Sequence, residues 1–213
     1  MNKLICFDVD GTLTENRNSW LILTAGLGVP DDKVVEIYEK TENGAMSISD
    51  GVKRVVELFR ATGRANKEYI YNLLSNIDLK PDAIEISRYL KEKGYFIFLL
   101  SGAIDVRVRA VAEKVGADGF HTHATLIFNE AGALADIYYD GRQRSMKERV
   151  LRGLSAEYQI PLNEIIFVGD NDNDAAAFRI TGHGIAVQPY HEILEKVAWK
   201  TVKSLSEIKD ILK

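Results

Sequence analysis

The stretch LICFDVDGT at residues 4–12 decides the fold, because it joins a short apolar run to two closely spaced acids. The apolar run predicts a buried β-strand, and Asp8 and Asp10 follow at its carboxyl end. Side chains alternate along a strand, so acids two residues apart point to the same side. Open parallel sheets bind their ligands at the carboxyl ends of their strands. The stretch therefore predicts a functional site at the end of a buried strand.

Further strands and helices alternate along the rest of the chain. Short segments rich in β-branched or aromatic residues predict strands at 95–100, 120–123, 165–168 and 184–187, and a last strand near 199–202. Helical patterns lie between them at 82–93, 104–115, 146–158 and 191–197, with a final helix at 206–212. This alternation predicts an α/β fold with a doubly wound, mainly parallel sheet and helices on both faces.

The stretch from about residue 14 to residue 79 breaks the alternation, because it has helical patterns and no convincing strand. These patterns cover residues 19–27, 31–40, 49–60 and 66–75, with Asp31, Ser49 and Asn66 as the expected N-caps. We therefore expect a core formed by residues 1–14 and 80–213, and an inserted helical cap domain at 15–79. Weak alternation over residues 125–139 predicts a β-hairpin appended to the sheet.

The composition is that of a globular chain without a basic surface for nucleic acid. The chain has 213 residues, 46% of them hydrophobic, and a formal net charge of -4 without a dense block of Lys and Arg. No apolar run is long enough to span a membrane, and residues 1–7 are too short for a signal peptide. The single cysteine, Cys6, excludes an intrachain disulfide and fits a small core residue. We expect a cytoplasmic protein whose partner is a small molecule.

Asp8 and Asp10 suit the transfer of a phosphoryl group from a monoester. That reaction requires a nucleophile, an acid for the leaving oxygen and positive charge around the phosphate. An aspartate is ionised at neutral pH, so Asp8 needs no base before it attacks phosphorus and forms an aspartyl-phosphate. Asp10 would protonate the departing alkoxide and later deprotonate the water that hydrolyses the intermediate.

A second acidic cluster, GDNDND at residues 169–174, follows the strand predicted at 165–168. Carboxylates that face a phosphate repel it, since like charges about 4 Å apart cost roughly 4 kcal/mol at an effective dielectric near 20. A divalent cation is therefore needed, and ligands that are all oxygens favour Mg²⁺ over zinc or copper. We expect Asp8 and Asp170 as ligands, the Asp10 backbone carbonyl as a further candidate, and Asp172 as a solvated neighbour.

Two further positions supply contacts for a phosphate. Ser101 and Gly102 follow a predicted strand and open a predicted helix, so the hydroxyl and free N–H groups there suit phosphate oxygens. Lys147, near the start of the helix after the hairpin, supplies a matching cation. Each feature alone is weak, and their order along the chain is what makes them informative.

That order resembles the haloacid dehalogenase superfamily, most closely its phosphoserine-phosphatase-like branch. The resemblance spans residue 3 to about residue 187 and rests on four motifs: residues 8–12, Ser101 with Gly102, Lys147, and residues 169–174. It implies a phosphatase with a cap of helices between the first and second motifs that closes over the substrate. It implies Asp8 as nucleophile, Asp10 as general acid and base, and Mg²⁺ on Asp8, Asp170 and the Asp10 carbonyl.

The resemblance also implies roles for the remaining motif residues. The phosphate contacts would come from Ser101, Gly102, Lys147 and Asn173. Asp174 would either support the metal site or orient Lys147.

The cap matches this branch poorly where substrate specificity is expected. The branch carries an acidic residue farther past the first motif than Glu15, and Arg17 stands nearer that place. Arg54 is a candidate partner for a substrate carboxylate, although its spacing from Ile48 differs by one residue from the expected pattern. Trp20 and Met46 are further candidates for substrate contact, and each cap candidate also fits cap core or solvated surface.

Other interpretations of these residues and of the whole chain remain open at the level of sequence. Asp8 and Asp10 also fit solvated turn acids or a calcium loop, although the preceding strand disfavours both. His121 and His123 share a strand face but lack a third metal ligand. The rival functions are a dehalogenase, a phosphomutase, and a phospho-accepting signalling module. Retention of Asp10 and the cluster at 169–174 disfavours a dehalogenase, and the size of the helical insertion disfavours the signalling module.

Overall fold

The computed structural model describes residues 3–140 and 143–213, and within these ranges seven strands form one sheet in the order β4-β3-β2-β1-β5-β6-β7. The strands are β1 (Lys3–Phe7), β2 (Tyr95–Ile104), β3 (Gly119–Phe128), β4 (Leu134–Tyr139), β5 (Ile166–Gly169), β6 (Gly184–Val187) and β7 (Lys200–Val202). In this part of the chain every neighbouring pair is parallel except β3 and β4, which are antiparallel. The expected α/β fold and the appended hairpin are confirmed.

The strand β1 lies in the middle of the sheet because its apolar residues can be buried on both faces. Ile5 pairs with Ile97 of β2 on one side and with Ile166 of β5 on the other. Ile5 and Phe7 point into one hydrophobic core cluster, whereas Leu4 and Cys6 point into a second cluster on the opposite face. A continuous apolar run therefore forms a central strand, as parallel sheets require.

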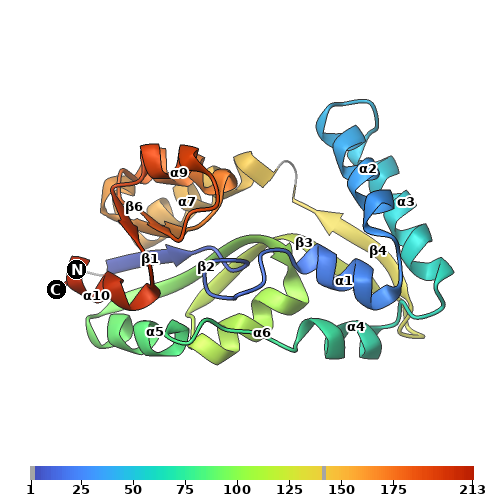
Figure 1. The fold of residues 1–213 in the computed structure, drawn as a ribbon, viewed down its shortest axis with the longest axis horizontal. Coiled ribbons are helices and arrows are strands. Elements are labelled where there is room, and N and C mark those ends of the chain that lie inside the picture. Colours follow the sequence, from blue (N-terminus) through green and yellow to red (C-terminus); the bar gives the residue numbers. More distant parts are fainter. Residues whose placement is uncertain (1–2, 141–142) are drawn as a thin grey trace.

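Helices cover both faces of the sheet (Figure 1). The helices α5 (Ala83–Glu92) and α6 (Asp105–Val115) pack on one face, and α7 (Gln143–Tyr158), α8 (Ala175–Thr181) and α9 (Glu192–Val197) pack on the other. The short helix α10 (Ile208–Ile211) follows a 3-10 turn at Leu205–Glu207 and lies near the start of β1 in Figure 1. None of the helices in the described ranges has the length and hydrophobicity needed to cross a lipid bilayer.

Four helices occupy the stretch between β1 and α5: α1 (Ser19–Leu27), α2 (Asp31–Glu42), α3 (Ile48–Ala61) and α4 (Lys67–Leu74). Figure 1 shows α2 and α3 standing beside β4, with α1 and α4 closer to α6. Phe59 of α3 and Ile70 of α4 belong to the same hydrophobic cluster as Leu126 of β3 and Ile137 of β4. The hairpin and these four helices therefore share one core.

Several local predictions need correction. Asp31 is the first residue of α2 rather than its N-cap, and Ser49 lies inside α3, which begins one residue earlier than expected. Ser47 caps α3 instead, because its Oγ accepts the Asp50 N–H at 3.0 Å. The Asn66 cap is confirmed, since its side chain accepts the Tyr69 N–H at 2.9 Å.

Other differences concern element lengths. The strands β2 and β3 run several residues beyond their predicted ends, and the expected last helix starts as a 3-10 turn at Leu205–Glu207 and continues as α10 (Ile208–Ile211). The helix α8, which directly follows the acidic cluster at 169–174, is not among the helices expected from the sequence. Residues 1, 2, 141 and 142 of the expected core lie outside the described part of the chain.

Candidate active site

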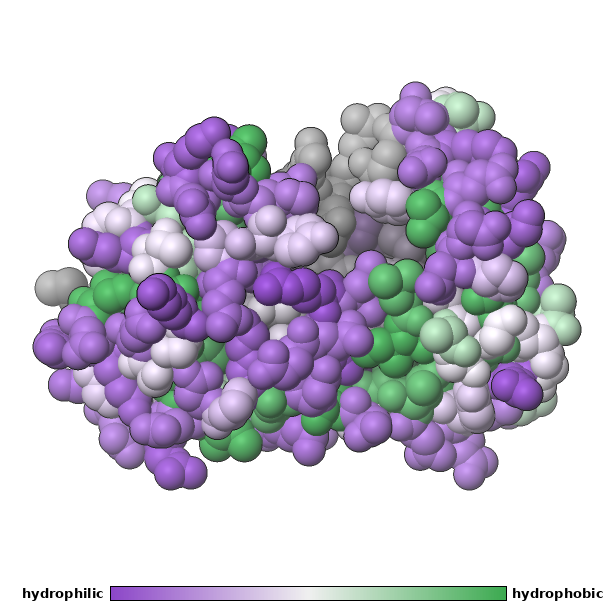
Figure 2. All heavy atoms as spheres, viewed as in Figure 1, coloured by the Kyte–Doolittle hydropathy of each residue, from purple (hydrophilic) through white to green (hydrophobic). Residues whose placement is uncertain are grey.

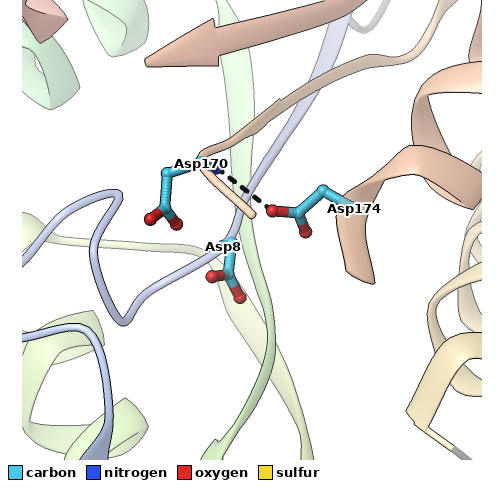
Figure 3. A group of neighbouring side chains, drawn as sticks. All are labelled: Asp8, Asp170 and Asp174. Atoms are coloured by element: carbon cyan, nitrogen blue, oxygen red, sulfur yellow. Dashed lines mark hydrogen bonds between the residues drawn. The ribbon is translucent and has the colours of Figure 1, made fainter. Parts of the chain in front are cut away.

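Three aspartates meet at the carboxyl ends of β1 and β5 (Figure 3). Asp8 follows β1, Asp170 follows β5, and Asp174 lies just before α8. Their exposed fractions are 4%, 1% and 0%, and one carboxylate oxygen from each lies within 4.8 Å of the others. Among the described residues this is the one group of three or more candidate metal-binding side chains. We call it the carboxylate cluster.

Two glycines allow this close approach. Gly11 has a φ of +85°, and a Cβ there would collide with the Asp170 carboxylate. A Cβ at Gly169 would collide in the same way with the Asp174 carboxylate. The glycines of the first and fourth motifs therefore leave the space that brings the acids together.

Lys147 of α7 neutralises part of the cluster. Its Nζ lies 3.0 Å from Asp8 Oδ1 and also donates to Asp174 Oδ1. Burial alone would lower the pKa of Lys147, but the charges of Asp174 and Asp8 outweigh burial and raise it above its ordinary value. The lysine therefore stays protonated. Asp174 also accepts the backbone N–H groups of Asp170 and Asn171, at 3.1 and 3.2 Å.

The negative charge that Lys147 does not neutralise contributes to raised pKa values of the acids themselves. Burial, followed by the charges of Asp8 and Asp174, raises the pKa of Asp170 to about 7. Burial is also the main cause that raises the pKa of Asp174 to about 6, although Lys147 opposes it. Buried carboxylates with raised pKa values and only oxygen donors fit a hard divalent cation such as Mg²⁺. The fit is supported by geometry as well, since the glycines hold the oxygens in one small space.

The Asp10 side chain does not belong to this cluster. Its carboxylate accepts the Ser19 N–H at 2.6 Å and the Arg107 Nε–H at 2.9 Å. Arg107 is fully buried in α6 and also donates through Nη2 to Asp78 Oδ1 at 2.6 Å. Burial raises the pKa of Asp10, and Arg107 partly opposes this. A proton-carrying role suits such a held carboxyl, whereas metal binding by Asp10 would involve its backbone carbonyl only.

Arg107 is a residue that the sequence analysis missed. It lies between two valines at the start of a helix and has no local feature that marks it. Its partner Asp10 is 97 residues away along the chain. No signal in a single sequence would have paired the two.

Ser101, Gly102 and Asn173 line the same cavity as Asp8 and Asp10. The Ser101 hydroxyl is buried and accepts the Ala103 N–H at 3.2 Å, while Asn173 Oδ1 lies 3.5 Å from Lys147 Nζ. The expectation that Ser101 and Gly102 open a helix is wrong. They belong to β2, which continues to Ile104 through an irregularity in its pairing with β3, and α6 begins only at Asp105.

The cavity has a volume of about 740 Å³ and extends from these residues to α1, α2 and α3. Figure 2 shows the surface hollowed between the side formed by α7 and α9 and the side formed by α2 and α3. Of the cap candidates, Arg17 and Trp20 line the cavity, whereas Glu15, Met46 and Arg54 are not among its described lining residues.

The two strand histidines lie in different environments. His121 Nε2 is 2.6 Å from Asp140 Oδ2, and the His123 ring meets the Tyr139 ring edge-on at 4.9 Å between centroids. His123 also lines the cavity. The pair does not belong to a group of three candidate metal ligands within residues 3–140 and 143–213.

Comparison with known proteins adds relatives across the whole chain. A family model for haloacid dehalogenase-like hydrolases matches residues 2–182. The phosphoserine phosphatase of Methanocaldococcus jannaschii is 26% identical over 185 residues, which is 86% of this chain and 84% of that enzyme. That of Archaeoglobus fulgidus is 30% identical over 199 residues; the match covers 92% of this chain but 55% of that enzyme's length.

A solved structure shows the same arrangement in three dimensions. It is described as a phospho-aspartyl intermediate analogue of phosphoserine phosphatase, has a TM-score of 0.78 and is 26% identical. The superposition covers 100% of this chain and 99% of the other. The likeness therefore extends over the α/β core and the inserted helices alike.

Proposed function

The chain belongs to the haloacid dehalogenase-like hydrolases and is a phosphatase, and from this premise we propose that it hydrolyses small phosphomonoesters with Mg²⁺ through an aspartyl-phosphate on Asp8. The observation that carries the proposal is the buried carboxylate cluster of Asp8, Asp170 and Asp174 at the carboxyl ends of β1 and β5. Lys147 and Arg17 offset part of the charge of the three acids, and a divalent cation would offset it further when a phosphate binds.

The first half of the proposed reaction transfers the phosphoryl group to the protein. A carboxylate oxygen of Asp8 forms a bond to phosphorus while the bond from phosphorus to the ester oxygen breaks. Asp10 gives its proton to that leaving oxygen, and Arg107 and the Ser19 N–H hold its carboxyl group in place. A bound Mg²⁺ would neutralise charge between the carboxylates and the phosphate.

The second half releases phosphate. Asp10, now ionised, takes a proton from water, and the water oxygen bonds to phosphorus as the bond to Asp8 breaks. The phosphate oxygens would be held by Lys147, the Ser101 hydroxyl, the Gly102 N–H and Asn173, which all reach the cavity or the cluster. Asp174 fixes Lys147 from the other side and so orients its ammonium toward Asp8.

The residues favour this reaction over dehalogenation on the same fold. Attack on carbon displaces a halide, which requires neither a proton donor nor a cation bound by carboxylates. Here Asp10 is held by two donors, and three buried acids share a site. A phosphomutase differs only in the final acceptor, so product identification distinguishes it.

The test measures phosphate release from a panel of phosphomonoesters that includes phosphoserine, sugar phosphates and nucleotides, with and without Mg²⁺. We expect release that requires Mg²⁺ and is abolished in Asp8→Asn, with the folded state of the variant checked by circular dichroism. Intact-protein mass spectra taken during turnover should show a phosphorylated species that Asp8→Asn lacks. Turnover by Asp8→Asn at the rate of the unchanged protein would overturn the proposal.

A further inference from the structure

The cavity that contains Asp8 is polar at one end and apolar along most of its wall. Its polar end comes from the carboxyl ends of β1, β2 and β5. Its wall comes from α1, α2 and α3 and from the two strands of the hairpin, and bears mainly hydrophobic side chains. We call this part the apolar wall; six members are used below: Trp20, Leu21, Val35, Tyr38, Ile48 and Tyr139.

Much of the apolar wall is open to solvent. Leu21, Val35, Tyr38 and Ile48 have exposed fractions of 42%, 44%, 52% and 43%, although large hydrophobic side chains are usually buried in a chain of this size. They come from three different helices, and yet all four line one cavity. Exposed hydrophobic side chains that gather in a hollow mark a surface that a ligand covers.

Aromatic rings extend this wall. The rings of Trp20 and Tyr139 stack with 5.6 Å between centroids and an angle of 14° between their planes. This pair joins α1 to the end of β4, so it fixes part of the wall across two elements. The two rings add a large area for contact with the carbon atoms of a ligand.

Cationic partners for the carboxylate of a small zwitterion are scarce along the cavity wall. Arg17 is the one Lys or Arg among the described residues that line the cavity, and its guanidinium is already paired with Asp170. The Asp31 carboxylate accepts the Thr24 hydroxyl. A substrate carboxylate placed against the hydrophobic side chains would lose hydration, and the described lining residues offer it no Lys or Arg other than Arg17.

We propose that the natural substrate is a phosphomonoester whose alcohol carries a hydrophobic body, which packs against the apolar wall while its phosphate faces Asp8. The proposal rests on the hydrolase function above and specifies its substrate class. The cavity as a whole has a volume of about 740 Å³, which is in the usual range for ligand sites and leaves room for an alcohol larger than that of phosphoserine.

The test uses ethyl, butyl and hexyl phosphate, because these esters have similar leaving groups and differ mainly in apolar area. We expect kcat/KM with Mg²⁺ to rise along the series by up to about fourfold per added methylene, the ratio that corresponds to about 0.8 kcal/mol per buried CH₂. Hexyl phosphate should also exceed phosphoserine. A flat series, or a preference for phosphoserine, would overturn the proposal and leave the hydrolase function standing.

A binding measurement separates the two proposals. Ethyl, butyl and hexyl phosphonate are not hydrolysed, and calorimetry with each should give a Kd that falls as the chain lengthens. This result is expected even if no phosphomonoester is hydrolysed, which would contradict the proposed function alone. Equal Kd values for the three phosphonates would contradict the substrate class alone.

Matched variants test whether the gain in kcat/KM and in affinity per methylene comes from the apolar wall. Ile48 and Ile84 both lie in the first turn of a helix with similar exposed fractions of 43% and 45%, but only Ile48 is among the residues that line the cavity. Ile48→Ser should reduce the gain per methylene in both series, as should Leu21→Ser, whereas Ile84→Ser should keep it. An equal reduction in Ile84→Ser would show that the gain does not come from the apolar wall.

Discussion

The guanidinium of Arg17 forms an ion pair with Asp170, one of the three acids of the carboxylate cluster. The same carboxylate accepts the Thr12 hydroxyl at 3.0 Å, and Arg17 also lies over the Tyr190 ring, 5.4 Å from its centroid. Arg17 is 38% exposed, whereas Asp170 is buried. A partly exposed arginine of the chain itself is therefore paired with an acid that is expected to bind Mg²⁺.

The first prediction is that Arg17 competes with Mg²⁺ for the Asp170 carboxylate. Arg17→Gln should tighten Mg²⁺ binding about two- to fivefold, because removing a partly exposed ion pair is worth up to about 1 kcal/mol. Titration calorimetry with Mg²⁺ measures the change. Arg54→Gln removes the same charge from the exposed side of α3, outside the cavity lining, and should leave the Kd unchanged. A weaker Kd in Arg17→Gln would mean that the arginine assists the metal site.

The second prediction concerns pH. Folding raises the pKa of Asp170 to about 7 from an ordinary value near 3.8, so the folded protein holds this proton more tightly than the unfolded chain. The group stabilises the metal-free protein at low pH, and this contribution is lost as pH rises from about 4 to about 7. Mg²⁺ binds the ionised form, so its stabilising effect should grow over the upper part of that range.

Thermal unfolding with and without Mg²⁺ at pH 6 and pH 8 checks this. The Mg²⁺-induced increase in Tm should be clearly larger at pH 8 than at pH 6. Asp170→Asn should reduce the increase at both pH values and remove most of the difference between them. An increase that is the same at both pH values in the unchanged protein would contradict the proposed protonation of Asp170.

The third prediction concerns Lys147, whose ammonium lies between Asp8 and Asp174 with an exposed fraction of zero. Lys147→Met should lower the free energy of unfolding by about 3–5 kcal/mol without metal, since it leaves buried carboxylates without a counter-charge. Adding Asp174→Asn should restore part of the loss. Urea unfolding in EDTA measures both variants.

A surface lysine provides the control for this variant. Lys91 pairs with Asp118 at 2.5 Å but is partly exposed, so Lys91→Met should cost less than about 1 kcal/mol. If Lys147→Met and Lys91→Met unfold at the same urea concentration, Lys147 does not stabilise the buried carboxylates of Asp8 and Asp174.

The sequence is sufficient to predict which motifs meet, because parallel strands place their carboxyl ends along one edge. Asp8 and Asp170 are 162 positions apart in numbering, yet each follows an apolar run that forms a central strand. Ser101 reaches the same cavity from β2, although the sequence pattern places the helix start too early. The general position of the site is thus predictable, and the local backbone at each motif is less so.

The contacts that adjust the site are not predictable in this way. Arg17 lies in the loop between β1 and α1 and pairs with Asp170 beyond β5, and Arg107 of α6 pairs with Asp10 beyond β1. Both pairs join segments far apart in sequence, and no local pattern specifies them. The apolar wall is likewise assembled from three helices and a hairpin. A hydrophobic residue such as Ile48 has the same sequence character whether it faces a core or a cavity.

The fourth prediction concerns Arg107 as a positioning residue for Asp10. Its Nε–H and Nη2–H bind Asp10 and Asp78, and its Nη1 is the one buried side-chain polar atom without a hydrogen-bond partner among the described residues. Arg107→Met removes both bonds and should lower kcat at least about tenfold, a part of the factor of roughly 10²–10⁴ that a positioned acid contributes. KM should change less, because Arg107 is not among the residues that line the cavity.

Two further measurements separate positioning from general loss of structure. The leaving oxygen of an aryl phosphate needs less help from an acid than that of an alkyl phosphate. Arg107→Met should therefore slow the transfer of the phosphoryl group to Asp8 less for an aryl phosphate than for an alkyl phosphate. Asp78→Asn leaves the bond from Arg107 to Asp10 available, and since Asp78 is 44% exposed, we expect a smaller fall in kcat than in Arg107→Met. Equal losses for aryl and alkyl phosphates would indicate that Arg107 supports the fold rather than the proton transfer at Asp10.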